Sequence, residues 1–259
     1  MKEISMYIQT TMENCSYEVA FLSDIEESKI QLRLEIETVA SIQSRKSTID
    51  ETKNEIQKEL LKFKWIITGA ILVQFAWYLD GVARQETSKI GDMDNISKPI
   101  QDALTGANGI IIDDCQIKNL ETLWLTKNQS VQKHILGIEI RFTNSETQLK
   151  SNLHFIQFDG PMCLPINFDP TKIDELINAK LYLSGFKRLR RIASRFKNMN
   201  VNADQYLVVN SYVFHKTRLN GFDTNQILKT DELNKLCFNT GLTLSSFIKK
   251  IKKGKLNLS

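Results

Sequence analysis

The sequence predicts an α+β protein whose C-terminal part is mainly helical, and three observations support this fold class. Residues 29–36 alternate apolar and polar side chains, as a half-buried strand does. Apolar runs at 65–79 and 135–142 are rich in β-branched and aromatic residues, which favours further strands. Residues 171–197 instead carry apolar side chains at helical spacing. The 259 residues, 42% of them apolar, suffice for one large or two ordinary domains.

The first 28 residues are an N-terminal extension to which we assign no function. They lack a basic start followed by an apolar run, so they do not resemble a secretory signal. After the first predicted strand, Arg45 and Lys46 lie in a basic turn. Thr48 and Glu51 then form a capping box, which predicts the start of a helix.

The most apolar window, residues 65–79, could be a membrane span or a buried strand. Its 15 residues are fewer than the roughly 20 that a helix needs to cross a bilayer, and Thr68, Gly69 and Gln74 interrupt it. We therefore expect a buried strand and no membrane association. The four cysteines are far apart and form no C-x-x-C pair, which indicates neither a zinc ribbon nor a disulfide framework and fits a reducing cytoplasm.

Residues 91–116 concentrate acidic groups between apolar segments. Asp92 and Asp94 are two apart, so their carboxylates leave the same face of an extended segment. Asn95 is expected to cap a short amphipathic helix. After a glycine-rich turn, the apolar run 110–112 predicts a buried strand that ends in carboxylates.

Carboxylates at the end of one strand and in the loop before a helix can converge on a cation. Oxygen ligands suit Mg²⁺ or Mn²⁺ rather than zinc. Two such ions could hydrolyse a phosphodiester. Acidic residues near turns are also commonly just exposed to solvent. The length and order of the whole motif favour a metal site over solvated carboxylates.

The acidic stretch resembles the signature of RusA-type Holliday junction resolvases, D-x-D-N-x-x-K, a helix ending in D-A-L, a turn, and an apolar strand ending in D-D-x-Q-[IV]. The resemblance rests on Asp92, Asp94, Asn95, Lys98, Asp102, Ala103, Leu104, Asp113, Asp114, Gln116 and Ile117. It implies that Asp92, Asp94 and Asp114 are catalytic metal ligands for Mg²⁺ or Mn²⁺. It also implies that Lys98 contacts the scissile phosphate or the attacking water. Asp113 is expected to support the metal ligands without binding the metal itself.

The resemblance covers about residues 29–144 and implies a RusA-like core at 29–145. In it, a mixed or antiparallel sheet packs against helices. Residues 117–125 and 135–142 are expected to be two strands of a hairpin. Members of the family act as homodimers on branched DNA, which suits the two-fold symmetry of a four-way junction.

Residues 146–259 are predicted to form a second, basic domain. The segment from 186 to 259 contains 15 Lys and Arg but only 4 Asp and Glu. This excess of positive charge favours phosphate contacts, although solvated lysine-rich faces are also common. A helix after Asp169 and Pro170, a break near Gly185 and a second, basic helix are expected. Candidate DNA-binding residues on that second helix are Lys187, Arg188, Arg190, Arg191 and Arg195.

Residues 231–254 match the spacing of a helix-turn-helix, with Gly241 at the turn and Thr243 capping the second helix. Ordinary helical hairpins match it too. In the DNA-binding interpretation the phosphate contacts come from Lys249, Lys250, Lys252 and Lys253, in addition to Arg45 and Lys46.

We therefore predict a metal-dependent endonuclease for branched DNA. Two alternatives remain at this point. One is a DNA-binding regulator with a non-catalytic core, and the other is an effector nuclease that acts on other DNA.

Overall fold

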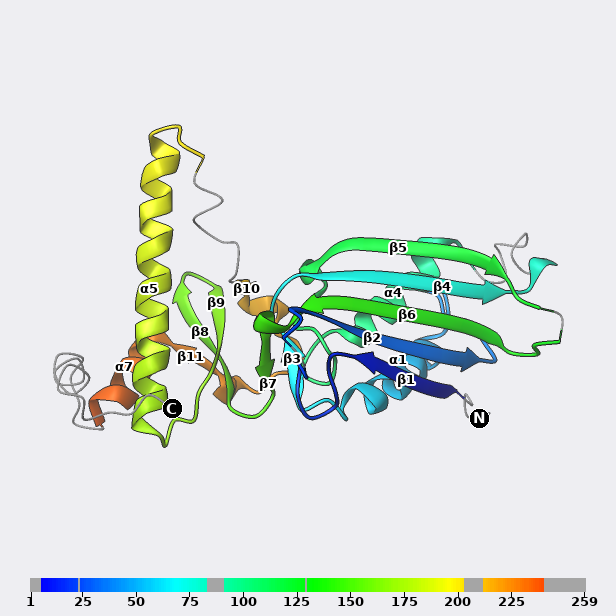
Figure 1. Ribbon diagram of the computed structural model, residues 1–259, viewed down its shortest axis with the longest axis horizontal. Coiled ribbons are helices and arrows are strands. Elements are labelled where there is room, and N and C mark those ends of the chain that lie inside the picture. Colours follow the sequence, from blue (N-terminus) through cyan, green and yellow to red (C-terminus); the bar gives the residue numbers. More distant parts are fainter. Residues whose placement is uncertain (1–5, 23, 83–90, 129, 203–211, 240–259) are drawn as a thin grey trace. The chain divides into compact units, whose positions relative to one another are not determined.

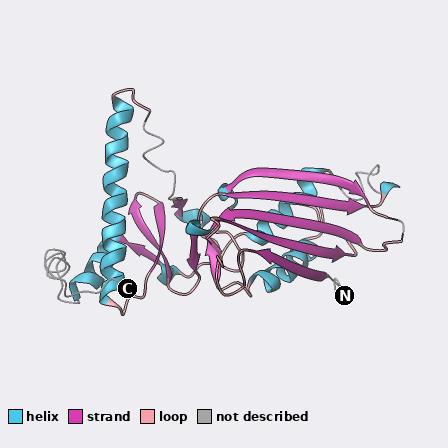
Figure 2. Cartoon of the chain, viewed as in Figure 1, coloured by secondary structure: helices cyan, strands magenta, loops and turns pink. Residues whose placement is uncertain are grey.

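The computed structural model describes residues 6–22, 24–82, 91–128, 130–202 and 212–239. The chain divides into two compact units. The first unit comprises Met1–Lys150 and Arg218–Phe222, and the second comprises Ser151–Thr217 and Asp223–Ser259. Figure 1 traces the elements of each unit, and Figure 2 colours them by type.

The first unit is built on a five-stranded mixed sheet. Its strand order is β1-β2-β6-β4-β5, with β4 and β5 parallel and the other neighbours antiparallel. The strands are β1 (Tyr7–Glu13), β2 (Glu27–Ile36), β4 (Ile71–Leu79), β5 (Ile117–Thr126) and β6 (His134–Thr143). The predicted α+β class with a mixed sheet is confirmed.

One face of this sheet forms the core under two helices, α1 (Lys46–Leu60) and α4 (Met93–Leu104). The alternation predicted for residues 29–36 is present, since the apolar side chains of β2 are buried. They pack in one cluster with Ile56 of α1 and Ile100 of α4. Each such side chain contributes roughly 1.5–3 kcal/mol on burial, so apolar packing holds α4 against the sheet.

The window 65–79 forms two strands rather than one. β3 (Trp65–Ile67) pairs with β7 (Thr147–Leu149), and the chain then enters β4. The hairpin expected between β5 and β6 is wrong, because β4 lies between them and pairs with both. The connection from residue 127 to 133 is long enough to pass β4, since two strand spacings amount to only about 10 Å.

Two predictions at the N-terminal end are also corrected. The predicted extension is not separate from the core, because its residues 7–13 form β1, which pairs with β2 along its whole length and lies at an edge of the sheet. The helix α1 begins at Lys46 with Arg45 as its N-cap, so Thr48 lies inside the first turn and does not cap it. Its carbonyl instead accepts a hydrogen bond from the Thr52 hydroxyl.

The described part of the second unit combines a four-stranded sheet with two α-helices. The strand order is β10-β9-β8-β11. The elements are β8 (Leu153–Asp159), β9 (Met162–Asn167), α5 (Ile173–Asn198), β10 (Phe214–His215), β11 (Ile227–Lys229) and α7 (Thr230–Asn239). The expected C-terminal helices are present, whereas the sequence analysis did not predict the sheet.

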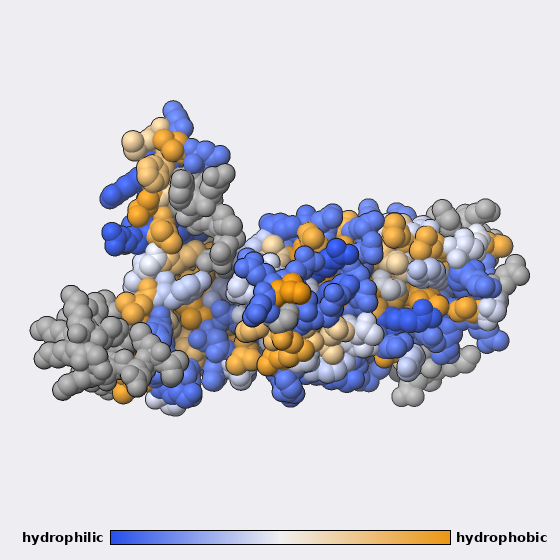
Figure 3. All heavy atoms as spheres, in the orientation of Figure 1, coloured by the Kyte–Doolittle hydropathy of each residue, from blue (hydrophilic) through white to orange (hydrophobic). Residues whose placement is uncertain are grey.

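The helix α5 runs through Gly185 without the break that the sequence predicted (Figure 1). Leu183 and Phe186, on either side of the glycine, are buried in the core of this unit, so packing carries the helix across it. Figure 3 shows hydrophilic and hydrophobic residues side by side on the C-terminal part of α5, at the upper left of the view. Leu189, Ile192 and Phe196 of this helix are exposed hydrophobic residues.

Several predicted features lie outside the described residues. They include most of the apolar run 205–214, and the part of the helix-turn-helix that follows α7, with Lys249, Lys250, Lys252 and Lys253. Within the described part of the chain, no helix has the length and apolar character needed to cross a membrane.

Replacement of Gly185 by alanine should raise the free energy of unfolding of the second unit by about 0.5–1 kcal/mol, because alanine is the better helix former. An added Cβ meets no atom within 4 Å. Urea unfolding followed by circular dichroism measures the change.

Gly160 is the matched control, since its Cβ would also meet nothing within 4 Å but its φ is +52°. Gly160→Ala should destabilise the unit by about 1 kcal/mol. A helix that breaks at Gly185 in solution would instead lose stability in the Gly185→Ala variant.

Candidate active site

The acidic turn, residues Asp113–Gln116, is held by the side chain of Gln116. This residue is fully buried, and its amide makes four hydrogen bonds to backbone groups. Its Oε1 accepts from the N–H groups of Ile112 (2.7 Å) and Asp113 (3.0 Å). Its Nε2 donates to the carbonyls of Ile67 (2.9 Å) and Gly69 (2.8 Å). The turn is thereby fixed to the backbone that joins β3 to β4.

The strand predicted at 110–112 is absent. The three isoleucines are buried, but they make only isolated bridges, from Ile111 to Ile67 and to Thr105. The backbone N–H of Ile112 is bound to the Gln116 side chain instead of to a neighbouring strand. A short 3₁₀ turn, η1 (Asp114–Gln116), follows directly.

The second acidic segment begins α4. Asp92 is the N-cap and accepts a hydrogen bond from the N–H of Asn95 (3.1 Å), so the prediction that Asn95 caps this helix is wrong. Asp94 is exposed in the first turn. Asp94, Lys98 and Asp102 follow one another at intervals of four, which places them on one face of the helix, about 6 Å apart along its axis.

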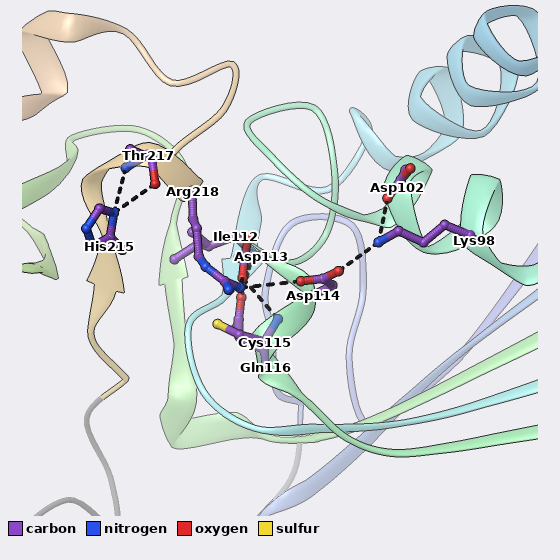
Figure 4. A network of polar contacts seen from close by, with 10 residues as sticks. All are labelled: Lys98, Asp102, Ile112, Asp113, Asp114, Cys115, Gln116, His215, Thr217 and Arg218. Atoms are coloured by element: carbon purple, nitrogen blue, oxygen red, sulfur yellow. Dashed lines mark hydrogen bonds and ion pairs between the residues drawn. The ribbon is translucent and has the colours of Figure 1, made fainter. Parts of the chain in front are cut away.

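Lys98 joins the two acidic segments (Figure 4). Its Nζ lies 2.8 Å from Oδ2 of Asp114 and 3.0 Å from Oδ1 of Asp102. Partial burial alone would lower the pKa of Lys98, but the hydrogen bonds to Asp114 and Asp102 raise it above its usual value. The side chain is therefore a cation at neutral pH and suits charge stabilisation rather than proton abstraction.

Asp113 is less exposed than Asp114, with 14% of its side chain accessible against 37% for Asp114. Its Oδ1 accepts from the N–H of Cys115 (3.0 Å) and from Nη1 of Arg218 (2.7 Å). Burial acts to raise the pKa of Asp113, but the hydrogen bonds from Cys115 and Arg218 outweigh it and lower the pKa. Asp113 therefore stabilises the turn, whereas Asp114 presents its carboxylate more openly.

The structure assigns roles to two residues at this site that the sequence does not reveal. Gln116 belongs to the motif, and the D-x-x-Q spacing of a capping box with Asp113 is the one local signal of its role. Arg218 lies 105 residues beyond Asp113, and no local pattern in the sequence indicates the contact.

The donor types at this site fit a hard divalent cation. Asp92, Asp94 and Asp114 offer carboxylate oxygens and are all at least partly exposed, and the cap bond of Asp92 uses one of its two oxygens. Among the residues that the structure describes, however, no three such groups lie close enough together to hold a metal ion. Burial and the neighbouring Asp113 raise the pKa of the Cys115 thiol to about 12, so this thiol is protonated at neutral pH.

The predicted DNA-binding residues fall in both units. In the first unit, Arg45 and Lys46 are exposed at the start of α1. In the second, basic side chains of α5 line a groove together with Phe158 and Asp159, and the guanidinium of Arg190 lies 5.4 Å from the centre of the Phe158 ring. The basic residues in this groove are Lys187, Arg190, Arg191 and Arg195. Arg188 is exposed but does not line it.

Substitution of Gln116 by leucine should lower the free energy of unfolding by about 3 kcal/mol or more. Four buried backbone groups would lose their partner, and each costs roughly 1–3 kcal/mol when left unpaired. Urea unfolding measures this loss. Gln74→Leu is the control, because Gln74 makes one exposed hydrogen bond, to Glu121. Equal losses in the two variants would contradict the anchoring role.

Asp113→Asn should destabilise the protein more at pH 6 than at pH 3. The folded pKa of Asp113 is lowered, so its stabilisation is present above the unfolded pKa of about 3.9 and is lost as the pH falls through the folded pKa. Unfolding curves at both pH values give the difference. Asp50→Asn, on the exposed side of α1, should show no such change, and a pH-independent loss in Asp113→Asn would refute the ion pair's role.

Comparison with known families agrees with this geometry. The family model for Endodeoxyribonuclease RusA matches residues 4–141, which is more than half of the chain and includes α4 and the acidic turn. No curated protein matches the sequence. The matched region contains both acidic segments that Lys98 joins. The chain therefore belongs to the RusA family of endodeoxyribonucleases, hydrolases that cleave phosphodiester bonds of DNA at Holliday junctions.

Proposed function

We propose that this protein is a Mg²⁺-dependent resolvase, with Mn²⁺ as a possible substitute, which cuts four-way DNA junctions as a homodimer. The observation that carries the proposal is the contact of Lys98 with both Asp102 and Asp114, which brings the two acidic segments of the family motif to one place. Membership of the family supports branched DNA as the substrate.

We assign Asp92, Asp94 and Asp114 as the residues that hold the cation. All three offer hard oxygen donors, and Asp94 lies on the helix face that Lys98 turns toward Asp114. When bound, a divalent ion activates water for attack on phosphorus and neutralises charge on the phosphate oxygens.

Lys98 would stabilise the negative charge that develops on the phosphate during the reaction. Its two carboxylate partners keep it protonated, and 44% of its side chain is exposed to an approaching substrate. A fixed ammonium group beside the scissile phosphate stabilises the transition state without any proton transfer.

The second unit would hold the DNA through its basic groove. Four cationic side chains along α5 follow a surface that phosphates can approach, and the nearby Phe158 offers an aromatic face. Arg45 and Lys46 would add contacts at the first unit. Contacts of this kind supply affinity for DNA of any sequence, so they position the substrate and do not select a base.

A homodimer follows from the symmetry of the substrate. One chain carries one copy of the acidic motif, whereas a four-way junction needs two symmetric cuts. Two chains related by a two-fold axis would supply both.

Asp94→Asn should reduce Mg²⁺-dependent cleavage of a synthetic four-way junction by about 100-fold or more, because it removes a ligand charge, while junction binding persists. The measurement compares the junction with matched duplex and single-stranded DNA, and paired nicks on the junction alone are expected for the unmodified protein.

Asp174→Asn is the matched control, since Asp174 is likewise an exposed aspartate in the first turn of a helix, α5. It should cut as the unmodified protein does. Cleavage of duplex and junction alike would favour an effector nuclease. Tight binding without cleavage of any DNA would favour a regulator with an inactive core.

A further inference from the structure

A short segment from the C-terminal part of the sequence belongs to the first unit. The chain leaves this unit at Lys150 and returns to it for Arg218–Phe222, which we call the return segment. These residues lie far outside the region 4–141 that the family model matches. The return segment is therefore an addition to the part of the chain that defines the family.

The return segment is packed firmly against the turn that follows α4. Leu219 is buried, and the carbonyl of Asn220 comes so close to Gly106 that a Cβ there would lie 2.8 Å from the oxygen. Gly106 also has a φ of +87°, which a side chain would strain. Asn220 and Gly221 form one wall of a cavity of about 390 Å³ whose other lining residues include Lys53 and Asp102. Arg218 is thus held in place by its own segment.

The guanidinium of Arg218 lies beside the acidic turn (Figure 4). Its Nη1 is 2.7 Å from Oδ1 of Asp113 and 3.6 Å from Oδ1 of Asp114, while Lys98 contacts the other oxygen of Asp114. Asp114 therefore has a cation on either side. One comes from the family motif and the other from the return segment.

Arg218 retains donors for a ligand. Half of its side chain is exposed, and within the described residues only Nη1 is engaged, which leaves Nε and Nη2. A guanidinium presents its N–H groups in a planar fork that matches two oxygens of a phosphate. The three nearby carboxylates of Asp102, Asp113 and Asp114 repel a phosphate, so a second cation beside Lys98 lowers the cost of its approach.

We propose that Arg218 is a substrate-binding residue of the nuclease site, which contacts a DNA phosphate next to Asp114 on the side opposite Lys98. This inference rests on the proposed function for the identity of the ligand. It adds to the active site a residue that the family region does not contain. Because Arg218 also fixes Asp113, a phosphate bound there is held at a defined place relative to the acidic turn.

The first test is the salt dependence of junction binding in EDTA, where no cutting occurs. The logarithm of the association constant falls as the logarithm of the salt concentration rises, and one lost phosphate contact makes this slope shallower by about 0.9. Arg218→Ala should show this change and Arg218→Lys should show little. The matched control is Arg141→Ala, since Arg141 is about equally exposed (51% against 50%) and likewise forms a close ion pair, with Glu139 at 2.6 Å. The control should keep the full slope.

The second test is cleavage in Mg²⁺ with added methylguanidinium. Arg218→Ala should cut the junction at least about 10-fold more slowly than Arg141→Ala, and methylguanidinium should restore part of the rate in the former variant alone. A purely structural role for Arg218 predicts no such rescue.

The outcomes separate the two proposals. Equal slopes and equal rates in the two alanine variants would overturn the role of Arg218 even if the unmodified protein resolves junctions. If the unmodified protein cuts no junction, the proposed function fails, and the slope in EDTA still decides whether Arg218 contacts a phosphate. Arg218→Gln covers the case in which Arg218→Ala does not fold, because glutamine keeps a hydrogen-bonding side chain of similar size but removes the charge. This variant should lose the same slope of about 0.9, and an unchanged slope would overturn the role of Arg218.

Discussion

The buried amide of Gln116 is the interaction on which the active site depends. It binds the N–H groups of Ile112 and Asp113 and the carbonyls of Ile67 and Gly69, and all four are buried or partly buried backbone groups. Without it, these four groups would need other partners, because buried backbone groups are costly when they are left unpaired. One side chain therefore lets the sequence end an apolar segment in carboxylates instead of in a regular strand.

Charge balance is the second constraint. A site for a divalent cation must collect carboxylates, and in the absence of the ion their mutual repulsion destabilises the fold. Here Lys98 neutralises part of that charge from α4, and Arg218 does so from the return segment. The same two side chains suit a phosphodiester, because their positive charge offsets the repulsion between the phosphate and the carboxylates. In the proposed function, the same two side chains thus stabilise the site and bind the substrate.

The second unit adds a groove lined by basic side chains to the family core. The basic residues of α5 follow one another on a long helix, and Leu183 and Phe186 fix that helix to the unit's own core. Basic grooves of this kind bind DNA through its backbone and lose affinity with salt. The phosphate contact proposed for Arg218 would give the C-terminal part of the sequence a second role, next to the acidic turn.

The sequence by itself determined the class of the fold, the family and the acidic motif, because alternation in residues 29–36 and the spacing of Asp92, Asp94, Lys98 and Asp114 are local patterns. It did not determine which strands pair, since β4 lies between β5 and β6 through contacts far apart in the chain. The N-cap predicted for α4 was wrong, because Asp92 and Asn95 are both good capping residues and only the backbone geometry shows which of them precedes the first helical residue. The contact of Arg218 with Asp113 spans 105 residues, and only the packing of Leu219 and Asn220 against the turn after α4 decides it.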